Sequence, residues 1–233
     1  MEAEREVIRQ ELRTPRSAAI AGIAFSVLLI TALVLLRLSV PKDPSEAAKW
    51  LSDRAQRNAL TVALSLIPFA GIAFLWFIGV VRDRIGRYED RFFATVLLGS
   101  GLLFVAMLFV AAAFAGGRVA DAMARTAPEP SALWGVGRRV TATLLNVYAM
   151  RMAAVFTIST ATIAVRTKVM PRWIAFAGYA IAVVLLFGIG ITPWVQLIFP
   201  AWILLVSIDT LVVSLRRGRV ERVPDPGPEE PSA

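Results

Sequence analysis

Residues 140–165 read VTATLLNVYAMRMAAVFTISTATIAV, the only long apolar stretch of the chain with a strong charge, Arg151, near its middle. Arg151 divides the stretch into apolar halves of 11 and 14 residues. Each half is shorter than the roughly 20 residues that a membrane-spanning helix needs. We therefore expect one spanning helix over the whole stretch, with a guanidinium inside the bilayer. Such a charge costs about 2.5 to more than 10 kcal/mol unless a partner or water stabilises it.

The composition of the whole chain is typical of a membrane protein. Of its 233 residues, 57% are hydrophobic, whereas apolar residues make up about half of a soluble domain. These residues also occur in long blocks, which the core of a soluble protein would interrupt with polar positions. The sequence therefore predicts an all-α fold, a polytopic bundle of transmembrane helices.

Six apolar runs lie between charged connections, and we expect each of them to span the membrane. The runs cover residues 18–36, 59–81, 92–116, 140–165, 173–191 and 194–215, which together form a transmembrane domain over 18–215. Residues 1–17 precede this domain as a short polar helix on the cytoplasmic side. Residues 216–233 follow it as a disordered cytoplasmic tail rich in proline and glutamate.

Two local patterns concern the first half of the chain. Ala18, Gly22 and Ser26 repeat at four-residue spacing, a pattern of small residues that lets two membrane helices approach closely. Residues 41–58 contain a capping motif and Trp50, which predicts either a short helix in the membrane interface or a helical lead-in to the second span.

The net charge of +8 is spread over the ends of the apolar runs and is not concentrated in one patch. This distribution is typical of membrane topology and does not indicate nucleic-acid binding. With both termini in the cytoplasm, the inner segments hold fifteen basic residues and the outer segments nine. The positive-inside rule therefore predicts that both termini are cytoplasmic.

The fourth run carries a polar face that includes Arg151. On a helical wheel this face holds Thr141, Tyr148, Arg151, Ser159 and Thr162. Such a stripe must face protein or water, so we expect this helix at the centre of the bundle.

Asp209, in the sixth run, is the only acidic residue inside any run. Measured from the outer ends of the runs, Arg151 lies about 17 Å deep and Asp209 about 22 Å deep. We therefore expect an intramembrane pair of Arg151 and Asp209, supported by the hydroxyl of Tyr148 and that of Ser207. The pair is either a gate or binding site for an anionic group, or a contact that only fixes the register of two helices.

Other polar and aromatic residues of the runs have two interpretations. Asn146, Tyr179 and Gln196 either line a cavity or form hydrogen bonds between helices, and the second is the more common role of such residues. The tryptophans of the runs and their flanks, Trp202 among them, are interpreted as interfacial or lipid-facing residues.

The chain has no cysteine and no histidine, which excludes disulfides, thiol nucleophiles and histidine acid–base chemistry. It also lacks the nucleotide-binding, hydrolase and metalloprotease motifs. Intramembrane aspartate proteolysis would need a second buried carboxylate. We therefore expect no enzyme activity, no cofactor and no metal.

The last quarter of the chain carries a recurrent pattern of proline and tryptophan. Lys168-Val169-Met170-Pro171-Arg172-Trp173 is followed by Gly178-Tyr179, by Pro193-Trp194 and by Phe199-Pro200-Ala201-Trp202. This segment resembles the last two spans of uncharacterised six-span membrane proteins of high-GC bacteria. The resemblance implies six spans and a location in the bacterial plasma membrane, and it brings no activity.

The sequence leaves two functions open. The first is a non-catalytic membrane protein, structural or regulatory, whose basic inner loops and tail contact anionic lipid headgroups, a protein partner or a second copy of the chain. The alternative is a small transporter or channel for an anionic solute that uses Arg151. A transporter predicts a water-accessible path to Arg151, and a structural protein predicts a closed core.

Overall fold

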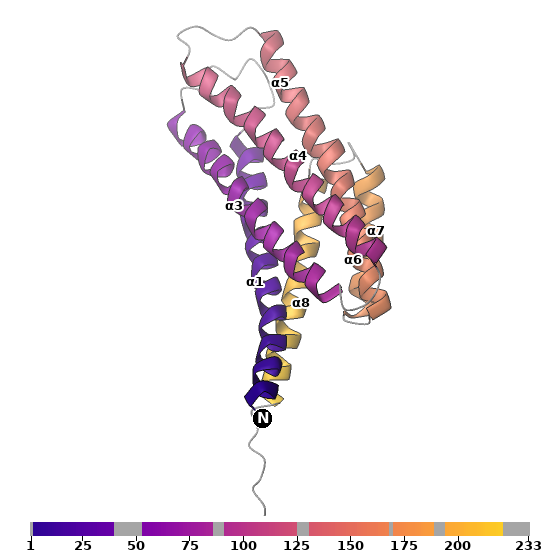
Figure 1. The fold of residues 1–233 in the computed structure, drawn as a ribbon. Coiled ribbons are helices and arrows are strands. Elements are labelled where there is room, and N and C mark those ends of the chain that lie inside the picture. Colours follow the sequence, from indigo (N-terminus) through magenta and orange to yellow (C-terminus); the bar gives the residue numbers. More distant parts are fainter. Residues whose placement is uncertain are drawn as a thin grey trace, which may run out of the picture.

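The structure, a computed structural model, describes residues 2–39, 53–85, 91–124, 131–167, 170–188 and 194–220, and it is helical throughout these segments apart from their ends. In chain order the elements are α1 (Glu2–Ser39), α3 (Arg54–Ile85), α4 (Arg91–Ala124), α5 (Ser131–Thr143), the π-helix η2 (Leu144–Ala149), α6 (Met150–Thr167), α7 (Arg172–Phe187), the 3₁₀-helix η3 (Val195–Leu197) and α8 (Ile198–Val220). No strand occurs among the described residues. The expected all-α fold is thus confirmed (Figure 1).

Several of these helices are suited to a bilayer. Five are long and apolar enough to cross a membrane, and a sixth apolar helix, α7, is shorter. The five candidate spans are Arg16–Leu38, Arg54–Arg82, Phe92–Gly117, Gly135–Thr167 and Val195–Arg216. Large apolar side chains, such as those of Phe69, Trp76 and Trp173, are exposed on the perimeter of the bundle. Exposed apolar surface on this scale is characteristic of contact with lipid.

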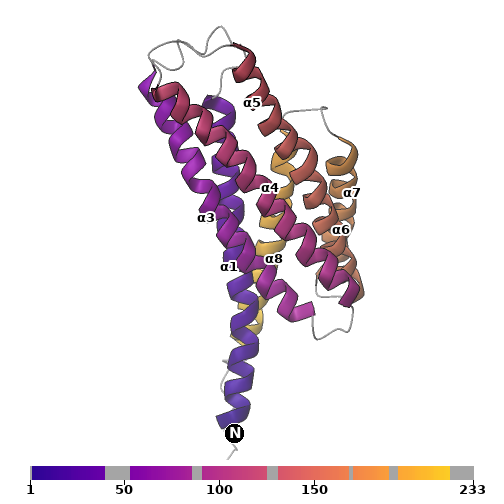
Figure 2. The ribbon, with the colours of Figure 1, turned by 45° about the horizontal axis from the view of Figure 1, so that its top comes forward.

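The helix bounds differ from the predicted runs where a helix continues beyond its apolar part. The predicted polar helix over 1–17 and the first run belong to one continuous helix, α1. The fourth run, 140–165, is the lower part of a helix that extends without interruption from Ser131 to Thr167 (Figure 2). Hydropathy does not detect such extensions, because a helix can leave the hydrocarbon region and remain helical.

Two expectations fall on segments that the structure describes only in part. The segment predicted as an interfacial helix with Trp50, 41–58, is described only from residue 53 on. Of the predicted disordered tail, 216–233, residues 216–220 are helical as the end of α8, and the rest lie outside the described residues. The second predicted span begins earlier than expected, at Arg54. There the Oδ1 atom of Asp53 accepts a hydrogen bond of 2.9 Å from the amide of Ala55, which is a helix N-cap.

The helices pack as an elongated bundle. As drawn in Figure 1, α1 begins and α8 ends at the lower end, whereas α3 begins and α5 begins at the upper end. We use these two terms below. α1 packs against α3 and α8, α4 lies between α3 and α6, and α7 packs against α6. Neighbours in the chain are therefore mostly neighbours in space, as short connections require.

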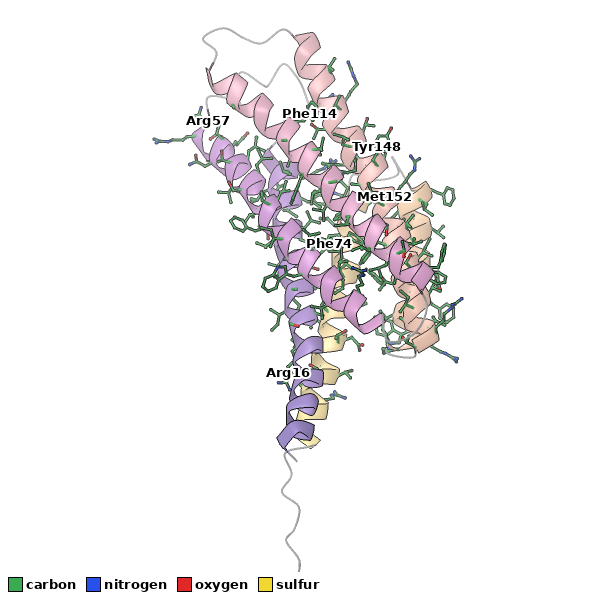
Figure 3. All side chains as sticks on the ribbon, in the orientation of Figure 1. Arg16, Arg57, Phe74, Phe114, Tyr148 and Met152 are labelled. Carbon is green, nitrogen blue, oxygen red and sulfur yellow. The ribbon has the colours of Figure 1, made fainter. Side chains whose placement is uncertain are left out.

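Six phenylalanine rings fill the centre of the bundle. They are Phe25 of α1, Phe74 and Phe77 of α3, Phe104 of α4, Phe156 of α6 and Phe199 of α8, and all are buried. We call this group the Phe cluster. The centroid of the Phe74 ring lies 4.4 Å from that of Phe25, 5.3 Å from Phe104, 5.1 Å from Phe156 and 5.8 Å from Phe199. Figure 3 shows Phe74 in the middle of the molecule.

The Phe cluster explains how the helices associate. Lipid tails are as apolar as leucine, so the hydrophobic effect does not hold helices together inside a bilayer, and close packing must do so. Tilted and edge-to-face ring pairs contribute about 0.5–1.5 kcal/mol each beyond the area that they bury. Phe74 makes such contacts with four other helices at once, so it fixes their relative positions.

The predicted small-residue contact of the first helix is confirmed. A Cβ atom at Gly22 would collide with the Oγ of Ser207 in α8 and would lie 2.9 Å from the Phe77 ring of α3. Ser26 is buried, and its Oγ donates a hydrogen bond of 2.8 Å to the Gly22 carbonyl oxygen. Gly22 therefore lets α1 approach α3 and α8 at the same level.

We expect Gly22→Ala to lower the free energy of unfolding by about 1–3 kcal/mol, because the added methyl group overpacks this crossing. The matched control is Gly99→Ala, since a Cβ at Gly99 has no atom within 4 Å. Thermal unfolding of both variants in a mild detergent measures the difference. Equal melting temperatures for the two variants would contradict the proposed close approach at Gly22.

Candidate functional site

The polar face of α6 is largely satisfied by its own backbone. Five hydroxyls on α6 each donate a hydrogen bond of 2.8–2.9 Å to the carbonyl oxygen four residues earlier. They belong to Thr157, Ser159, Thr160, Thr162 and Thr167. Such bonds remove the cost of a hydroxyl in an apolar environment. Within the stripe found in the sequence, the hydroxyls of Ser159 and Thr162 are therefore already bound, whereas the side chains of Tyr148 and Arg151 form no hydrogen bond to a described residue.

Two hydrogen bonds connect α6 and its π-helix to neighbouring segments. The Nε2 of Gln196 in η3 donates to the Oδ1 of Asn146 in η2. The hydroxyls of Thr162 in α6 and Tyr179 in α7 share a hydrogen bond of 2.8 Å. Of the two interpretations given for these residues, the structure confirms hydrogen bonding between helices.

The π-helix η2 was not expected from the sequence. It spans Leu144–Ala149, and the amide of Met150 at its end donates to the carbonyl oxygens of Leu145 and Val147. π-Helical turns are rare and occur mainly at functional sites. A π-turn is wider than an α-turn, so the helical wheel drawn for an ideal helix does not hold through this segment. Tyr148 belongs to η2, and Arg151 directly follows Met150, the C-cap residue of η2.

Arg151 lies on the exposed side of α6. The Thr162–Tyr179 hydrogen bond sets the register of the antiparallel helices α6 and α7. From Tyr179, α7 continues only to Phe187, which corresponds to about residue 154 of α6. Arg151 and Tyr148 therefore lie just beyond the end of α7 and are not covered by it, and Tyr148 is 54% exposed. Figure 3 shows Tyr148 in the upper half of the molecule.

The structure does not bring Arg151 and Asp209 together. Asp209 is half-buried in α8, and no ion pair or hydrogen bond joins either side chain to another described residue. The Asn146–Gln196 hydrogen bond places these two residues at the same level of the parallel helices α6 and α8. Arg151 lies five residues below this level and Asp209 thirteen, and the contact of Phe156 with Phe199 separates the two residues even more, so Asp209 lies at least about 12 Å farther down the bundle.

The physical reason for this separation is the unequal height of the helices. The expected depths were measured from the start of each apolar run, but the helix that holds Arg151 begins at Ser131, well above the start of α8. α8 also packs mainly against α1 and only slightly against α6. Ser207, expected to support the pair, is buried against Gly22, and its Oγ has no hydrogen-bond partner in the described part of the chain.

Trp202 is not an interfacial residue, and the expectation for it is wrong. Its side chain is 2% exposed, and its Nε1–H donates a hydrogen bond of 3.3 Å to the carbonyl oxygen of Ile174 in α7. A Cβ at Gly178 would lie 2.9 Å from the Trp202 ring. Trp76, Trp173 and Trp194 are exposed, as expected. The sequence feature that indicates this packing is Gly178, because a glycine in an apolar helix leaves room for a large ring of a neighbouring helix.

The charged side chains that the structure describes belong to eleven arginines and to two carboxylates, Asp53 and Asp209. The arginines are Arg16, Arg37, Arg54, Arg57, Arg82, Arg138, Arg139, Arg151, Arg166, Arg172 and Arg216. In the described part of the chain, no group of three histidine, cysteine, aspartate or glutamate side chains could hold a metal ion.

Five of these arginines gather toward the lower end of the bundle. The Nη2 of Arg16 in α1 donates a 3.5 Å hydrogen bond to the carbonyl oxygen of Ser214 in α8. The guanidinium of Arg166 lies 4.8 Å from the ring centroid of Phe93. Arg82, Arg172 and Arg216 are exposed, at the end of α3, the start of α7 and the last part of α8.

Comparisons of the chain with protein-family models, with curated proteins and with solved structures give no match. The resemblance to six-span proteins of high-GC bacteria therefore stays a prediction. What the protein does has to be argued from its own geometry.

Proposed function

We propose that this protein is a non-catalytic, multi-pass protein of the plasma membrane with a structural or regulatory role. The observation that carries the proposal is the Phe cluster, which fills the centre of the bundle with apolar rings. A transport path through the bundle would need polar groups or water at this level. The hydroxyl of Thr157, next to Phe156 in α6, is instead bound to the carbonyl oxygen of Ala153 in its own helix.

We further propose six spans with both termini in the cytoplasm. α7 is 16 residues long, or about 24 Å, which is short for a bilayer. We count α7 as a span because it connects the two ends of the bundle. α6, which precedes it, ends at the lower end, whereas η3, which follows it, is hydrogen-bonded through Gln196 to Asn146 in the upper half. The surplus of basic residues at the lower end supports a cytoplasmic position for that end.

The partner that we propose for the lower end is an anionic lipid surface. Exposed arginines close to a cytoplasmic leaflet attract anionic headgroups by about 1 kcal/mol each. Arg82, Arg172 and Arg216 are suited to this role, because their helices end or begin at the level where headgroups would lie.

The second candidate function, an anion transporter that uses Arg151, is favoured by one observation. Arg151 is exposed, and its guanidinium forms no ion pair with a described residue. This position is on the flank of the bundle, however, and the Phe cluster lies between it and the lower end. We therefore rank transport second.

The topology is testable because the natural chain has no cysteine. Leu38→Cys and Leu215→Cys place single thiols at exposed positions near the upper and lower ends of the spans. In intact cells, a membrane-impermeant maleimide should label Leu38→Cys, and it should label Leu215→Cys only after the cells are permeabilised. The reverse pattern would contradict the orientation, and labelling of both in intact cells would contradict the odd number of crossings between them.

The absence of transport is testable in reconstituted vesicles. We expect vesicles that contain the protein to release chloride and inorganic phosphate at the rate of protein-free vesicles. A release that depends on the protein and is abolished by Arg151→Gln would support the second candidate and contradict the first. Arg139→Gln is the matched control, since Arg139 is exposed on the same long helix, twelve residues before Arg151 and directly before the apolar run 140–165.

A further inference from the structure

We propose that Arg151 and Tyr148 bind a phosphate group, and that a phospholipid of the outer leaflet carries it. The choice of leaflet rests on the topology proposed above. The binding itself rests only on the position of the two side chains, on their charge and on the surface beside them.

The first step is the depth of Arg151. Phe25 and Phe156 both contact Phe74 and so mark one level of the bundle. Arg37 lies twelve residues above this level on α1, or about 18 Å, and Arg151 lies five residues above it on α6, or about 7.5 Å. The Cα atom of Arg151 is therefore about 10 Å below the level of Arg37, inside the apolar region.

The second step is the direction of the side chain. Cα–Cβ bonds in a helix tilt toward its N-terminus, and the N-terminal end of α6 faces the upper end of the bundle. The long stem of Arg151 therefore runs upward, along a flank that α7 leaves uncovered. An arginine at this depth snorkels, so that its guanidinium reaches the level of the lipid headgroups.

The third step is the countercharge. Of the two described carboxylates, Asp53 caps the start of α3, and Asp209 lies at least about 12 Å farther down the bundle than Arg151. A guanidinium at the edge of the hydrocarbon region needs an anion, and the phosphate of a phospholipid is the anion always present at this level. Arginine binds phosphate through two parallel N–H···O bonds.

Tyr148 supplies a second exposed donor, three residues before Arg151 in the chain. It lies about one turn above Arg151 toward the upper end, and its hydroxyl has no hydrogen bond to another described residue. A phenol at the membrane interface keeps its ring among apolar groups and directs its hydroxyl to the polar layer. Its O–H can therefore donate to the phosphate that Arg151 binds.

The surface below Arg151 favours a lipid over free phosphate. α7 ends there, and the side chain of its last residue, Phe187, is 79% exposed. The side chains of Val183 and Val184 are also exposed, but to a smaller extent. An acyl chain that hangs from a phosphate at Arg151 would run down along these side chains. Inorganic phosphate would make no contact with these side chains, so it would bind through its charge alone.

The test is the number and affinity of lipids that the full chain retains, measured by native mass spectrometry with added short-chain phosphatidylglycerol. We expect Arg151→Gln to lose one bound phospholipid, with an apparent affinity at that position weaker by about tenfold or more, since a charge-assisted pair is removed. Tyr148→Phe should weaken the same lipid by a smaller factor. Arg139→Gln should retain lipid as the parent protein does.

Further variants and probes decide the remaining outcomes. Arg151→Lys keeps the charge but loses the bidentate geometry, so it should bind with intermediate affinity even if Arg151→Gln cannot be purified. Equal lipid retention by Arg151→Gln and the parent would overturn the proposal. Displacement of the lipid by inorganic phosphate at the same concentration would overturn the lipid assignment, and loss of a dimer instead of a lipid would assign the site to a second copy of the chain.

The experiment separates this inference from the proposed function. Arg151→Gln leaves the lower-end arginines unchanged, so lipids that they hold should stay bound in this variant. A parent protein that retains the Arg151 lipid and no other would argue against the lower-end partner and not against the Arg151 site. An inverted topology in the cysteine-labelling experiment would move the site to the other leaflet and leave the lipid count unchanged.

Discussion

The packing of Phe74 against its neighbouring rings is the constraint on which the rest of the structure depends. Inside a bilayer, helices gain little from the hydrophobic effect and associate through close packing. The Phe74 ring contacts rings from α1, α4, α6 and α8, so one side chain of α3 positions four other helices. α7 is then held by the Trp202 hydrogen bond and by the close approach at Gly178. Since rings occupy the centre, the charged groups lie on the flanks and at the ends of the bundle.

The sequence predicts where the helices are, but it does not predict which side of each helix is buried and which side faces lipid. Each apolar run between charged connections is helical over its described residues, apart from Gly188 and Trp194. The Gly22 contact was predicted because small residues have a specific meaning in membrane helices. The core could not be predicted, because lipid-facing and buried positions are both apolar. Phe69 and Phe74 lie five residues apart in α3, yet Phe69 is exposed and Phe74 is buried.

The sequence identifies the unusual residue of the candidate site, Arg151, but it does not predict what surrounds this residue. A charge in an apolar run identifies Arg151 from the sequence alone. Its environment depends on where α7 ends, on the π-helix before it and on the level at which α8 begins, and none of these follows from hydropathy. The predicted pair with Asp209 assumed that the fourth and sixth helices begin at the same level. The two helices do meet, but through the Asn146–Gln196 hydrogen bond and the contact of Phe156 with Phe199.

The central claim, that the Phe cluster holds the bundle together and closes its centre, is tested most directly by the unfolding of Phe74→Ala beside Phe69→Ala in the same detergent. The account predicts that Phe74→Ala loses about 3–5 kcal/mol of stability, as a buried ring does when it is truncated. Phe69→Ala should stay close to the parent, because its ring faces outward. Equal melting temperatures for the two variants would contradict the account.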